Sequence, residues 1–309
     1  MKKIIYVTGT RADFGLISPT LKQIAVTTDL DLGIIITGMH LSKKHGYTAD
    51  LVKAAGLKII TEVKLPTGNK YKDMAVQLGK LIIRLSKIFS DLKPDMVLVE
   101  GDRFEALGTA IVASILNIAV VHVSGGDVSK SIDDSIRNAI TKLAHIHLPG
   151  TDKSAERIIK MGEESWRVHM VGTPINHNFS DKEVLESVIG FNFENPVLIV
   201  AQHPVTTESA NAAEQMKETM EAIKKLNLPT VIIYPNTDPG SKDMIKVIGL
   251  YKNLGNIKII PNLPSEQFMS LLKFARVIIG NSSAGIVEAS YFDTPCVNIG
   301  IRQEGRERA

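Results

Sequence analysis

Cysteine is nearly absent from this 309-residue chain, and its net charge is small. Cys296 is the only cysteine, which excludes an intrachain disulfide and makes a reducing cytoplasm the expected compartment. With 36 Lys and Arg against 33 Asp and Glu, the net charge of +3 is too small to indicate a nucleic-acid partner. A local basic cleft for an anionic ligand is compatible with this balance.

Long apolar runs are also missing. The run that follows Met1-Lys2-Lys3 stops at Thr8, far too early for an export segment, and no later stretch is long and free of charge. We therefore expect no membrane span. Gly9–Gly15 fits neither the G-x-G-x-x-G nor the G-x-x-x-x-G-K-[ST] pattern, so no dinucleotide cofactor is expected.

Short runs rich in Val and Ile alternate with longer helical patterns, which indicates an α/β fold with parallel sheets. The clearest helix is predicted over Tyr71–Leu92, where apolar residues recur every three or four positions. Strands are predicted to begin near Ile4, Leu32, Lys58, Met96, Ala119, Val168, Val197, Thr230, Ile257, Val277 and Cys296.

The length is compatible with roughly two domains. The best boundary is the polar stretch from Gly172 to Pro196, which carries two prolines and precedes a new strand. We predict two doubly wound, Rossmann-like domains with a deep cleft between them. Residues 1–175 are expected to form the N-terminal domain, and residues 176–309 are expected to form the C-terminal domain.

Five of the predicted strands end in a small, polar cluster. Because open α/β sheets bind ligands outside the carboxyl ends of their strands, these clusters predict one ligand held between two sheets. The clusters are Gly9–Asp13, Gly101–Arg103, His122–Asp127, Gln202–Pro204 and Gly280–Ser283.

Two of these clusters combine charges with a helix start. Arg11 could form bidentate hydrogen bonds to a phosphate or a carboxylate. The alternative is a solvated turn in which Asp13 caps the helix. Asp102 and Arg103 could pair and leave a carboxylate tuned for proton transfer, or Asp102 could cap the following helix.

The densest polar segment runs from His122 to Asp134, and its Gly125-Gly126 pair lets the backbone bend. Asp133 and Asp134 open a predicted helix, so one of them is expected to be its N-cap. Two carboxylates at a helix start can also serve as acid or base if a ligand closes over them. We favour a function for the segment as a whole.

In the second half, His203 follows a strand, where a histidine can bind phosphate or donate a proton, although a lone histidine is more often structural. In Gly280–Gly285, small residues let a diphosphate approach the backbone, and the serine hydroxyls add donors. Glu288, on the helix that follows, could hold two ribose hydroxyls. A G-x-S-x-G nucleophile elbow is rejected because Ala284 stands where the second glycine should be.

Two further features carry simpler interpretations. His145 and His147 would share one face of a strand, but we identify no further ligands and predict no metal site. The segment Arg302–Arg308 contains three arginines and two glutamates, and the simplest interpretation is a solvated tail.

Together, these clusters resemble the UDP-N-acetylglucosamine 2-epimerase family, and most closely its hydrolysing branch, which includes bacterial sialic-acid pathway enzymes. The resemblance extends over essentially the whole chain. It is carried by Gly9–Gly15, Gly101–Glu105, His122–Ser129, Ile132–Ala144, Gln202–Thr207, Pro235–Lys242, Gly280–Glu288 and Gly300–Gly305.

The resemblance implies a GT-B-like fold with a UDP-sugar in the interdomain cleft, a homodimer or homotetramer, and catalysis that needs no cofactor and no metal. The implied acid/base carboxylates are Asp102, Asp127, Asp133 and Asp134. The residues implied around the nucleotide are Arg11, Arg103, His203, Asn236, Ser282, Ser283, Glu288 and Arg302.

Three departures from the family pattern stand out. Asp127 occupies a position where relatives often have glutamate, so its carboxylate reaches less far. Ser124 occupies a position where the animal enzyme has glutamate. Relatives continue beyond the position of Ala309 with helices that complete the second domain, so we expect that domain to be incomplete here.

The reaction implied by the resemblance begins with elimination of UDP across sugar carbons 1 and 2. The resulting glycal takes up water at carbon 1 and a proton at carbon 2, which gives N-acetylmannosamine. The alternatives are a non-hydrolysing epimerase, a hydrolysing 2-epimerase of a modified bacterial sugar of the legionaminic-acid type, and a non-catalytic sugar-nucleotide binding protein. A GT-B glycosyltransferase is a weaker alternative, because Ile132–Ala144 fits the epimerases better.

Overall fold

Runs of β-branched residues form the strands of a first parallel sheet. The strand order is β3-β2-β1-β4-β5-β6, which is the order of a doubly wound Rossmann sheet with its reversal between β1 and β4. The carboxyl ends of β1 and β4 therefore mark the place where such sheets bind ligands. The strands are β1 (Lys2–Thr8), β2 (Leu30–Thr37), β3 (Ile59–Val63), β4 (Met96–Glu100), β5 (Ala119–Val123) and β6 (Ile146–Leu148).

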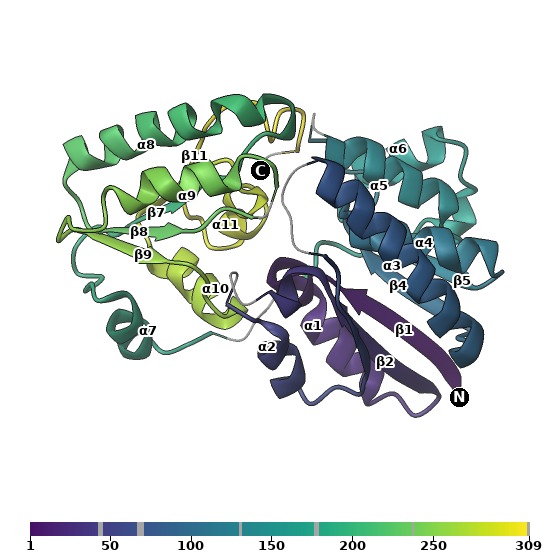
Figure 1. The fold of residues 1–309 in the computed structure, drawn as a ribbon. Coiled ribbons are helices and arrows are strands. Elements are labelled where there is room, and N and C mark those ends of the chain that lie inside the picture. The colour runs from purple at the N-terminus through teal and green to yellow at the C-terminus, as the bar shows by residue number, and fades with distance from the viewer. Residues whose placement is uncertain (43–45, 67–70, 130–131, 176–178, 237, 308–309) are drawn as a thin grey trace. The chain divides into compact units, whose positions relative to one another are not determined.

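This computed structural model describes residues 1–42, 46–66, 71–129, 132–175, 179–236 and 238–307. The chain divides into two compact units (Figure 1). Unit 1 consists of residues 1–127 and 132–176, and unit 2 consists of residues 128–131 and 177–309.

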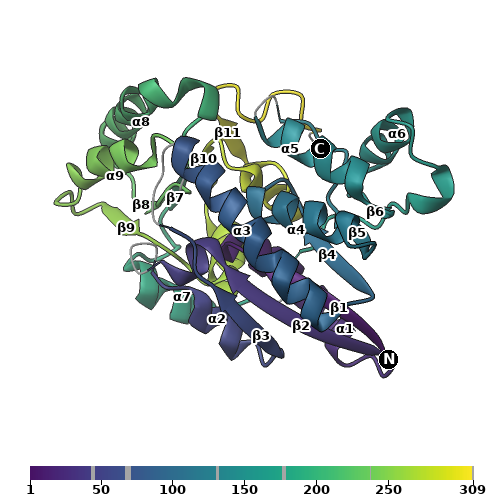
Figure 2. The ribbon, with the colours of Figure 1, turned by 45° about the vertical axis from the view of Figure 1, so that its right-hand side comes forward.

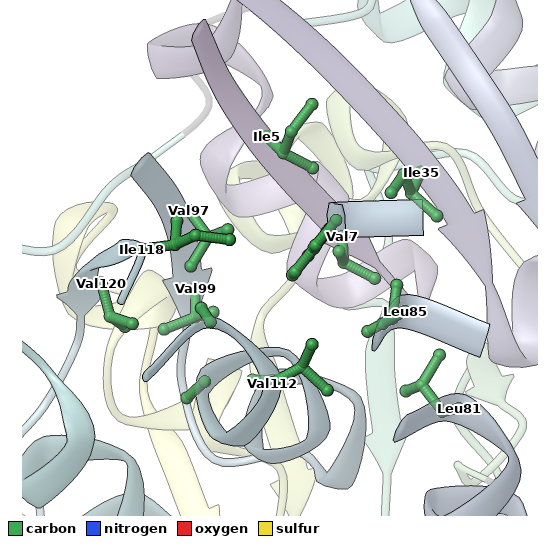
Figure 3. Packing of buried hydrophobic residues seen from close by; sticks show 14 of the residues in the cluster. Ile5, Val7, Ile35, Leu81, Leu85, Val97, Val99, Val112, Ile118 and Val120 are labelled. Atoms are coloured by element: carbon green, nitrogen blue, oxygen red, sulfur yellow. The ribbon is translucent and has the colours of Figure 1, made fainter. Parts of the chain in front are cut away.

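Successive residues of a strand point to opposite faces of the sheet, and in the first sheet both sets are apolar. Helices therefore cover both of its faces. Ile5 and Val7 share one hydrophobic cluster with Leu81 and Leu85 of α3, and Figure 3 shows Val7 near Leu85. On the other face, Ile4 and Tyr6 pack against α1 and α2. Helices α3 and α4 lie side by side (Figure 2). The helices of this unit are α1 (Arg11–Ala25), α2 (Ala49–Ala54), α3 (Tyr71–Leu92), α4 (Phe104–Ile115), α5 (Ile132–Leu143) and α6 (Asp152–Lys160), with 3-10 turns η1 (Gly38–Leu41) and η3 (Ser165–Arg167).

Unit 2 repeats the arrangement with a second parallel sheet of order β11-β10-β7-β8-β9. One face of this sheet packs against α8 and α9, which lie side by side in Figure 1. The strands are β7 (Leu198–Ala201), β8 (Thr230–Ile233), β9 (Ile257–Ile260), β10 (Val277–Gly280) and β11 (Cys296–Asn298). The helices are α7 (Lys182–Ile189), α8 (Ala212–Leu226), α9 (Ser241–Gly249), α10 (Ser265–Phe274) and α11 (Glu288–Tyr291), with 3-10 turns η4 (Thr206–Asn211) and η5 (Ser283–Gly285).

The predicted α/β class with two Rossmann-like parallel sheets is confirmed, and α3 has the bounds that its periodicity predicted. The strand predicted near Val168 is wrong. A 3-10 turn ends at Arg167, and Val168 makes only an isolated bridge to His147. His147 lies in β6, whereas His145 precedes that strand and its Nδ1 accepts the Val120 N–H at 3.1 Å. The two imidazoles therefore do not share a strand face.

Within the described residues, no helix is long and apolar enough to cross a membrane. The same part of the chain contains no group of three or more His, Cys, Asp or Glu side chains placed to hold a metal ion.

The α3 stripe gives a prediction about stability. Leu85 is fully buried in the core of unit 1, so Leu85→Ala is expected to lower the free energy of unfolding by about 2–5 kcal/mol, since it removes buried contacts and leaves a cavity. The matched change Leu250→Ala, at a residue that is 80% exposed, should stay within about 0.5 kcal/mol. Urea unfolding followed by circular dichroism measures both. Equal losses in the two variants would contradict the assignment of the core.

Candidate active site

The turn after β1 is closed by hydrogen bonds among its own residues. Thr10 is the N-cap of α1, and its hydroxyl accepts the Asp13 N–H at 3.2 Å. The Asp13 carboxylate accepts the Thr8 hydroxyl at 2.5 Å and the N–H groups of Gly9 and Thr10 at 3.0 and 3.1 Å. Asp13 thus takes part in capping α1, which was the structural alternative to a ligand-binding turn. The resulting capping box fixes the turn that contains Arg11.

Two arginines stand at the helix starts that follow β1 and β4. Arg11 is the first residue of α1, and burial lowers its pKa to about 10, which still leaves it charged at neutral pH. Arg103 is the N-cap residue of α4, so Asp102 does not cap that helix. The Arg103 Nε lies 3.1 Å from Oε2 of the buried Glu105. Burial raises the pKa of Glu105, and the Arg103 charge opposes that rise.

The centre of the site in unit 1 is Arg137 on α5, whose side chain is 1% exposed. Its Nη1 donates to Asp134 Oδ1 at 2.7 Å and to the Asp127 backbone carbonyl at 2.9 Å. Its Nη2 forms an ion pair with the Asp102 carboxylate. One guanidinium therefore gathers three of the four predicted carboxylate residues from separate stretches of the chain.

Three negative charges surround Arg137 and stabilise its positive charge. Burial lowers its pKa, but the negative charges of Asp102, Asp127 and Asp134 outweigh burial and raise it. The guanidinium is therefore positive. Its single positive charge is smaller than the summed negative charge of the three carboxylates. Asp133 lies in the first turn of α5, next to Asp134, and it is half-buried.

Asp127 is fixed by α6 as well as by α5. The Ser154 hydroxyl donates to Asp127 Oδ1 at 2.8 Å, and Arg157 donates to the Gly126 carbonyl at 3.1 Å. Gly126 has φ +78°, and a Cβ there would lie 2.2 Å from the Ser154 carbonyl oxygen. Only glycine allows this approach, which brings the Asp127 carboxylate to α6.

His122 is a buried support of the turn after β4. Its Nε2 lies 2.8 Å from the Gly101 carbonyl oxygen and its Nδ1 lies 3.2 Å from the Thr141 hydroxyl. Burial lowers the pKa of His122 to about 4, so the imidazole is neutral at pH 7. Because a carbonyl only accepts, Nε2 carries the proton, and Nδ1 accepts from Thr141. His122 thereby holds Gly101, the neighbour of Asp102.

Glu100 belongs to this site, although the sequence patterns did not single it out. It is the last residue of β4, and the Ser124 hydroxyl forms a hydrogen bond with its carboxyl group. Burial, followed by the charges of Asp13 and Asp102, raises the pKa of Glu100 to about 8. The available signal was a lone carboxylate that ends an otherwise apolar strand run.

In unit 2, the buried Asn281 holds the loop after β7. Its Oδ1 accepts the His203 N–H at 2.6 Å, and its Nδ2 donates to the His203 carbonyl at 2.8 Å. The Asn236 N–H donates to His203 Nδ1 at 3.1 Å. Neutral His203 therefore carries its proton on Nε2, which is a donor. Asn281 lies within the predicted cluster Gly280–Ser283, but it was not among the predicted site residues.

The other predicted residues of unit 2 lie along the chain that follows β10. Arg302 and Gln303 each donate to the Asn281 carbonyl, at 3.1 and 3.0 Å. Ser282 is the N-cap of η5, a single 3-10 turn that begins at Ser283. The expected helix is thus broken, and Glu288 begins the separate short helix α11. Burial raises the pKa of Glu288, and the charge of Arg306 opposes the rise.

The fold and these two strand-end sites define a protein with two Rossmann-like units of the GT-B type. Solved structures of known proteins share this fold, and two of them are described here. The UDP-GlcNAc 2-epimerase from Neisseria meningitidis, bound to UDP-GlcNAc, aligns with a TM-score of 0.81 and 18% identity over 98% of this chain and 84% of that one. The enzyme from Methanocaldococcus jannaschii, in complex with UDP-GlcNAc and UDP, aligns with a TM-score of 0.78 and 23% identity over 96% and 83% of the two chains.

Sequence comparison is more specific than the fold. Residues 22–309 match the family described as UDP-N-acetylglucosamine 2-epimerase, and the chain belongs to this family. A relative from Legionella pneumophila, the UDP-N,N'-diacetylbacillosamine 2-epimerase (hydrolyzing), is 36% identical over 100% of this chain and 84% of its own length. The UDP-N-acetylglucosamine 2-epimerase of Neisseria meningitidis serogroup B is 34% identical over 99% and 81%. The predicted family membership is thereby confirmed.

The buried state of His122 gives a prediction about pH. Its folded pKa of about 4 lies below the value near 6.5 of an exposed histidine, so the unfolded chain takes up the proton first as the pH falls. Wild type should therefore lose about 2 kcal/mol of stability relative to His122→Gln between pH 7 and pH 5. Urea unfolding of both proteins at the two pH values isolates this histidine from all other groups.

His169→Gln, at an exposed histidine of the same unit, is the control, and its stability should follow the wild type across this interval. A constant difference between wild type and His122→Gln at both pH values would contradict the neutral, buried imidazole.

Proposed function

We propose that the protein is a hydrolysing UDP-N-acetylglucosamine 2-epimerase that releases UDP and N-acetylmannosamine. The observation that carries this proposal is the convergence of Asp102, Asp127 and Asp134 on the buried Arg137 at the strand ends of unit 1. Epimerisation at a sugar carbon needs one group to remove a proton and another to return it. A site with several carboxylates around a buried cation suits both tasks.

In the proposed reaction, one carboxylate takes the hydrogen from carbon 2 while the bond between carbon 1 and UDP breaks. Water then adds to carbon 1 of the glycal, and a carboxylic acid protonates carbon 2 from the opposite face. The candidates for the two roles are Asp102, Asp127, Asp133 and Asp134. Arg137 supports the base role, because a nearby positive charge favours the ionised form of a carboxylate.

The departing UDP carries the developing negative charge, and donors fixed in advance stabilise such a charge best. We assign this task to the Nε2–H of His203, together with Asn236, Ser282, Ser283 and Arg302 of unit 2. Arg11 and Arg103 of unit 1 complete the set on the diphosphate, and Glu288 binds the ribose hydroxyls. We propose that the two domains that contribute these groups are residues 1–175 and residues 176–309.

A second candidate is hydrolysis and epimerisation of a modified nucleotide sugar. Two relatives favour it, since the proteins from Legionella pneumophila and Campylobacter jejuni are both named as hydrolysing 2-epimerases of N,N'-diacetylbacillosamine nucleotides. A non-hydrolysing epimerase would differ from both candidates in returning UDP to the glycal. Measuring free UDP against interconverted nucleotide sugar, for each substrate in turn, separates the three.

We further propose that the enzyme works in the cytoplasm as a homodimer or homotetramer. The single cysteine supports the reducing compartment. Val76 and Ile83 on α3 are 42% and 69% exposed, and apolar side chains of this kind support subunit pairing. Light scattering after size-exclusion chromatography measures the number of subunits.

The first functional test uses UDP-N-acetylglucosamine in deuterated water. We expect N-acetylmannosamine with deuterium at carbon 2, because that carbon receives its proton from a group that exchanges with solvent. Asp102→Asn should lower kcat about 10²–10⁴-fold, because the amide neither takes nor gives the proton. NMR of the product measures both effects.

Asp95→Asn is the matched control, since Asp95 is exposed, pairs with Lys2 and precedes the opposite end of β4. Its rate should equal that of the wild type. Product without deuterium at carbon 2 would overturn the proton-exchange reaction.

The second test concerns unit 2. Asn281→Ala removes both side-chain hydrogen bonds to the His203 backbone, so UDP affinity should fall at least about tenfold, which corresponds to roughly 1.4 kcal/mol. Asn256→Ala removes a hydrogen bond to the Leu228 carbonyl at the other end of the sheet and should bind UDP as the wild type does. Calorimetry with UDP measures both affinities. Equal affinities would argue against a UDP site around His203.

A further inference from the structure

His40 is a fully buried histidine of unit 1 that the proposed reaction does not use. It lies in η1, the 3-10 turn that follows β2. Its Nε2 lies 2.9 Å from the hydroxyl of Thr8, the last residue of β1, and its Nδ1 lies 2.8 Å from the Thr48 hydroxyl. Apolar groups of the same shape could fill this place without partners at little cost, so stability alone does not require these hydrogen bonds.

The hydrogen bonds through His40 run in one direction. The Thr8 hydroxyl donates to Asp13 Oδ1 at 2.5 Å. A hydroxyl has only one proton, so Thr8 must accept its second hydrogen bond from Nε2–H of His40. Nδ1 is then the acceptor of the ring, and the Thr48 hydroxyl donates to it. Four buried side chains thus form one continuous network.

This network ends on the turn that carries Arg11. The Asp13 carboxylate also accepts the N–H groups of Gly9 and Thr10, the two residues that precede Arg11. The His40 N–H donates to the Gly9 carbonyl at 3.3 Å. His40 therefore holds the turn twice, directly through its own backbone and indirectly through its side chain.

The turn is also closely packed. A Cβ at Gly9 would lie 2.7 Å from the Glu105 side chain. Gly38, the first residue of η1, has φ +59°, and a Cβ there would lie 2.6 Å from Glu105 Oε1 and 2.8 Å from the Gly9 carbonyl oxygen. Only glycine allows this approach. The η1 turn that carries His40 and the β1 turn are therefore in direct contact.

The surroundings of His40 keep its ring neutral. Burial lowers the pKa of His40 to about 4, and the positive charge of Arg11 acts in the same direction, whereas the negative charge of Glu105 opposes the fall. At pH 7 the imidazole can therefore donate and accept at the same time, as the network requires. It adds no positive charge beside Arg11.

The Thr48 hydroxyl serves this network and not a helix cap. Thr48 is the N-cap residue of α2, where a threonine ordinarily accepts an N–H from the first helical turn. Its side chain makes no capping hydrogen bond and bonds to His40 instead. In the same unit, the N-cap Thr10 does cap its helix. Helix α2 thus lacks a stabilising bond that its sequence could provide, which indicates that the network serves more than helix stability.

We propose that His40 is a positioning residue for Arg11. Its imidazole fixes Thr8 and Asp13, and thereby holds the β1 turn in the conformation in which Arg11 binds the diphosphate. The proposal rests on the proposed function, in which Arg11 contacts the departing UDP. His40 contacts no substrate atom and transfers no proton. Loss of the network should therefore weaken diphosphate binding although Arg11 itself is unchanged.

The test is a double-mutant cycle on UDP affinity. Thr8→Val keeps the shape of the side chain and removes the hydroxyl between His40 and Asp13, so it should lower UDP affinity about tenfold. Thr8→Ser keeps the hydroxyl and should bind UDP within about threefold of wild type. In an Arg11→Ala protein, Thr8→Val should cause almost no further loss, because no guanidinium is left to position. NMR titration with UDP follows strong and weak binding alike.

A second variant and a control complete the design. His40→Phe keeps a ring in contact with Phe14 and removes both nitrogen hydrogen bonds, and it should match Thr8→Val with and without Arg11→Ala. Thr230→Val is the control for the loss of a buried hydroxyl, since Thr230 donates to the Leu228 carbonyl at 2.9 Å and begins β8, away from the carboxyl end where such sheets bind ligands. It should bind UDP as the wild type does. Circular dichroism checks the fold of each variant, and the Thr8 variants decide the question if His40→Phe does not fold.

Two results would overturn the proposal. Equal losses from Thr8→Val with and without Arg11 would mean that the network supports the fold and not Arg11. Unchanged UDP affinity in folded Thr8→Val would mean that the turn keeps its conformation without the network. The cycle needs only UDP binding, so a wild type that binds UDP but releases no sugar product would overturn the proposed function alone. Normal turnover with additive losses would overturn this inference alone.

Discussion

The ion pairs of the buried Arg137 organise the polar end of the first sheet. A guanidinium that is 1% exposed is strongly disfavoured unless acceptors surround it, and Asp102, Asp134 and the Asp127 carbonyl provide them. These acceptors come from the β4 turn, the loop after β5 and helix α5 itself. Carboxylates that would repel one another are therefore fixed at one place, around the positive charge of Arg137. Such an arrangement suits proton transfer better than it suits stability.

Further buried hydrogen bonds hold the residues next to these charged groups. His122 is neutral and holds the Gly101 carbonyl, while Ser154 on α6 holds Asp127. In unit 2, the Asn281 side chain forms hydrogen bonds with both the N–H and the carbonyl group of His203. Buried polar side chains with satisfied hydrogen bonds fix local geometry, because breaking any one of these bonds would leave an unpaired group away from water. In both units, these hydrogen bonds fix polar residues at the ends of strands.

Much of the fold could be predicted, because the apolar pattern reports burial directly. The stripe of α3 and the parallel strands followed from periodicity, whereas Val168 was mistaken for a strand residue because its local composition does not reveal that a 3-10 turn precedes it. The predicted site residues were chosen by type and by position at strand ends. Their pairing was harder to predict. Arg103 pairs with Glu105, and Asp102 pairs with Arg137, which is 35 residues further along the chain.

By itself, the sequence determined the α/β class, the family and the candidate carboxylates, because these depend on local pattern and on residue types at strand ends. Only the tertiary structure decided which carboxylate shares which cation, and it showed that Glu100 and Asn281 belong to the two sites. The physical reason is that the pKa of an acid and the partner of an amide depend on burial and on charges from distant segments. The neighbouring residues in the chain do not contain that information.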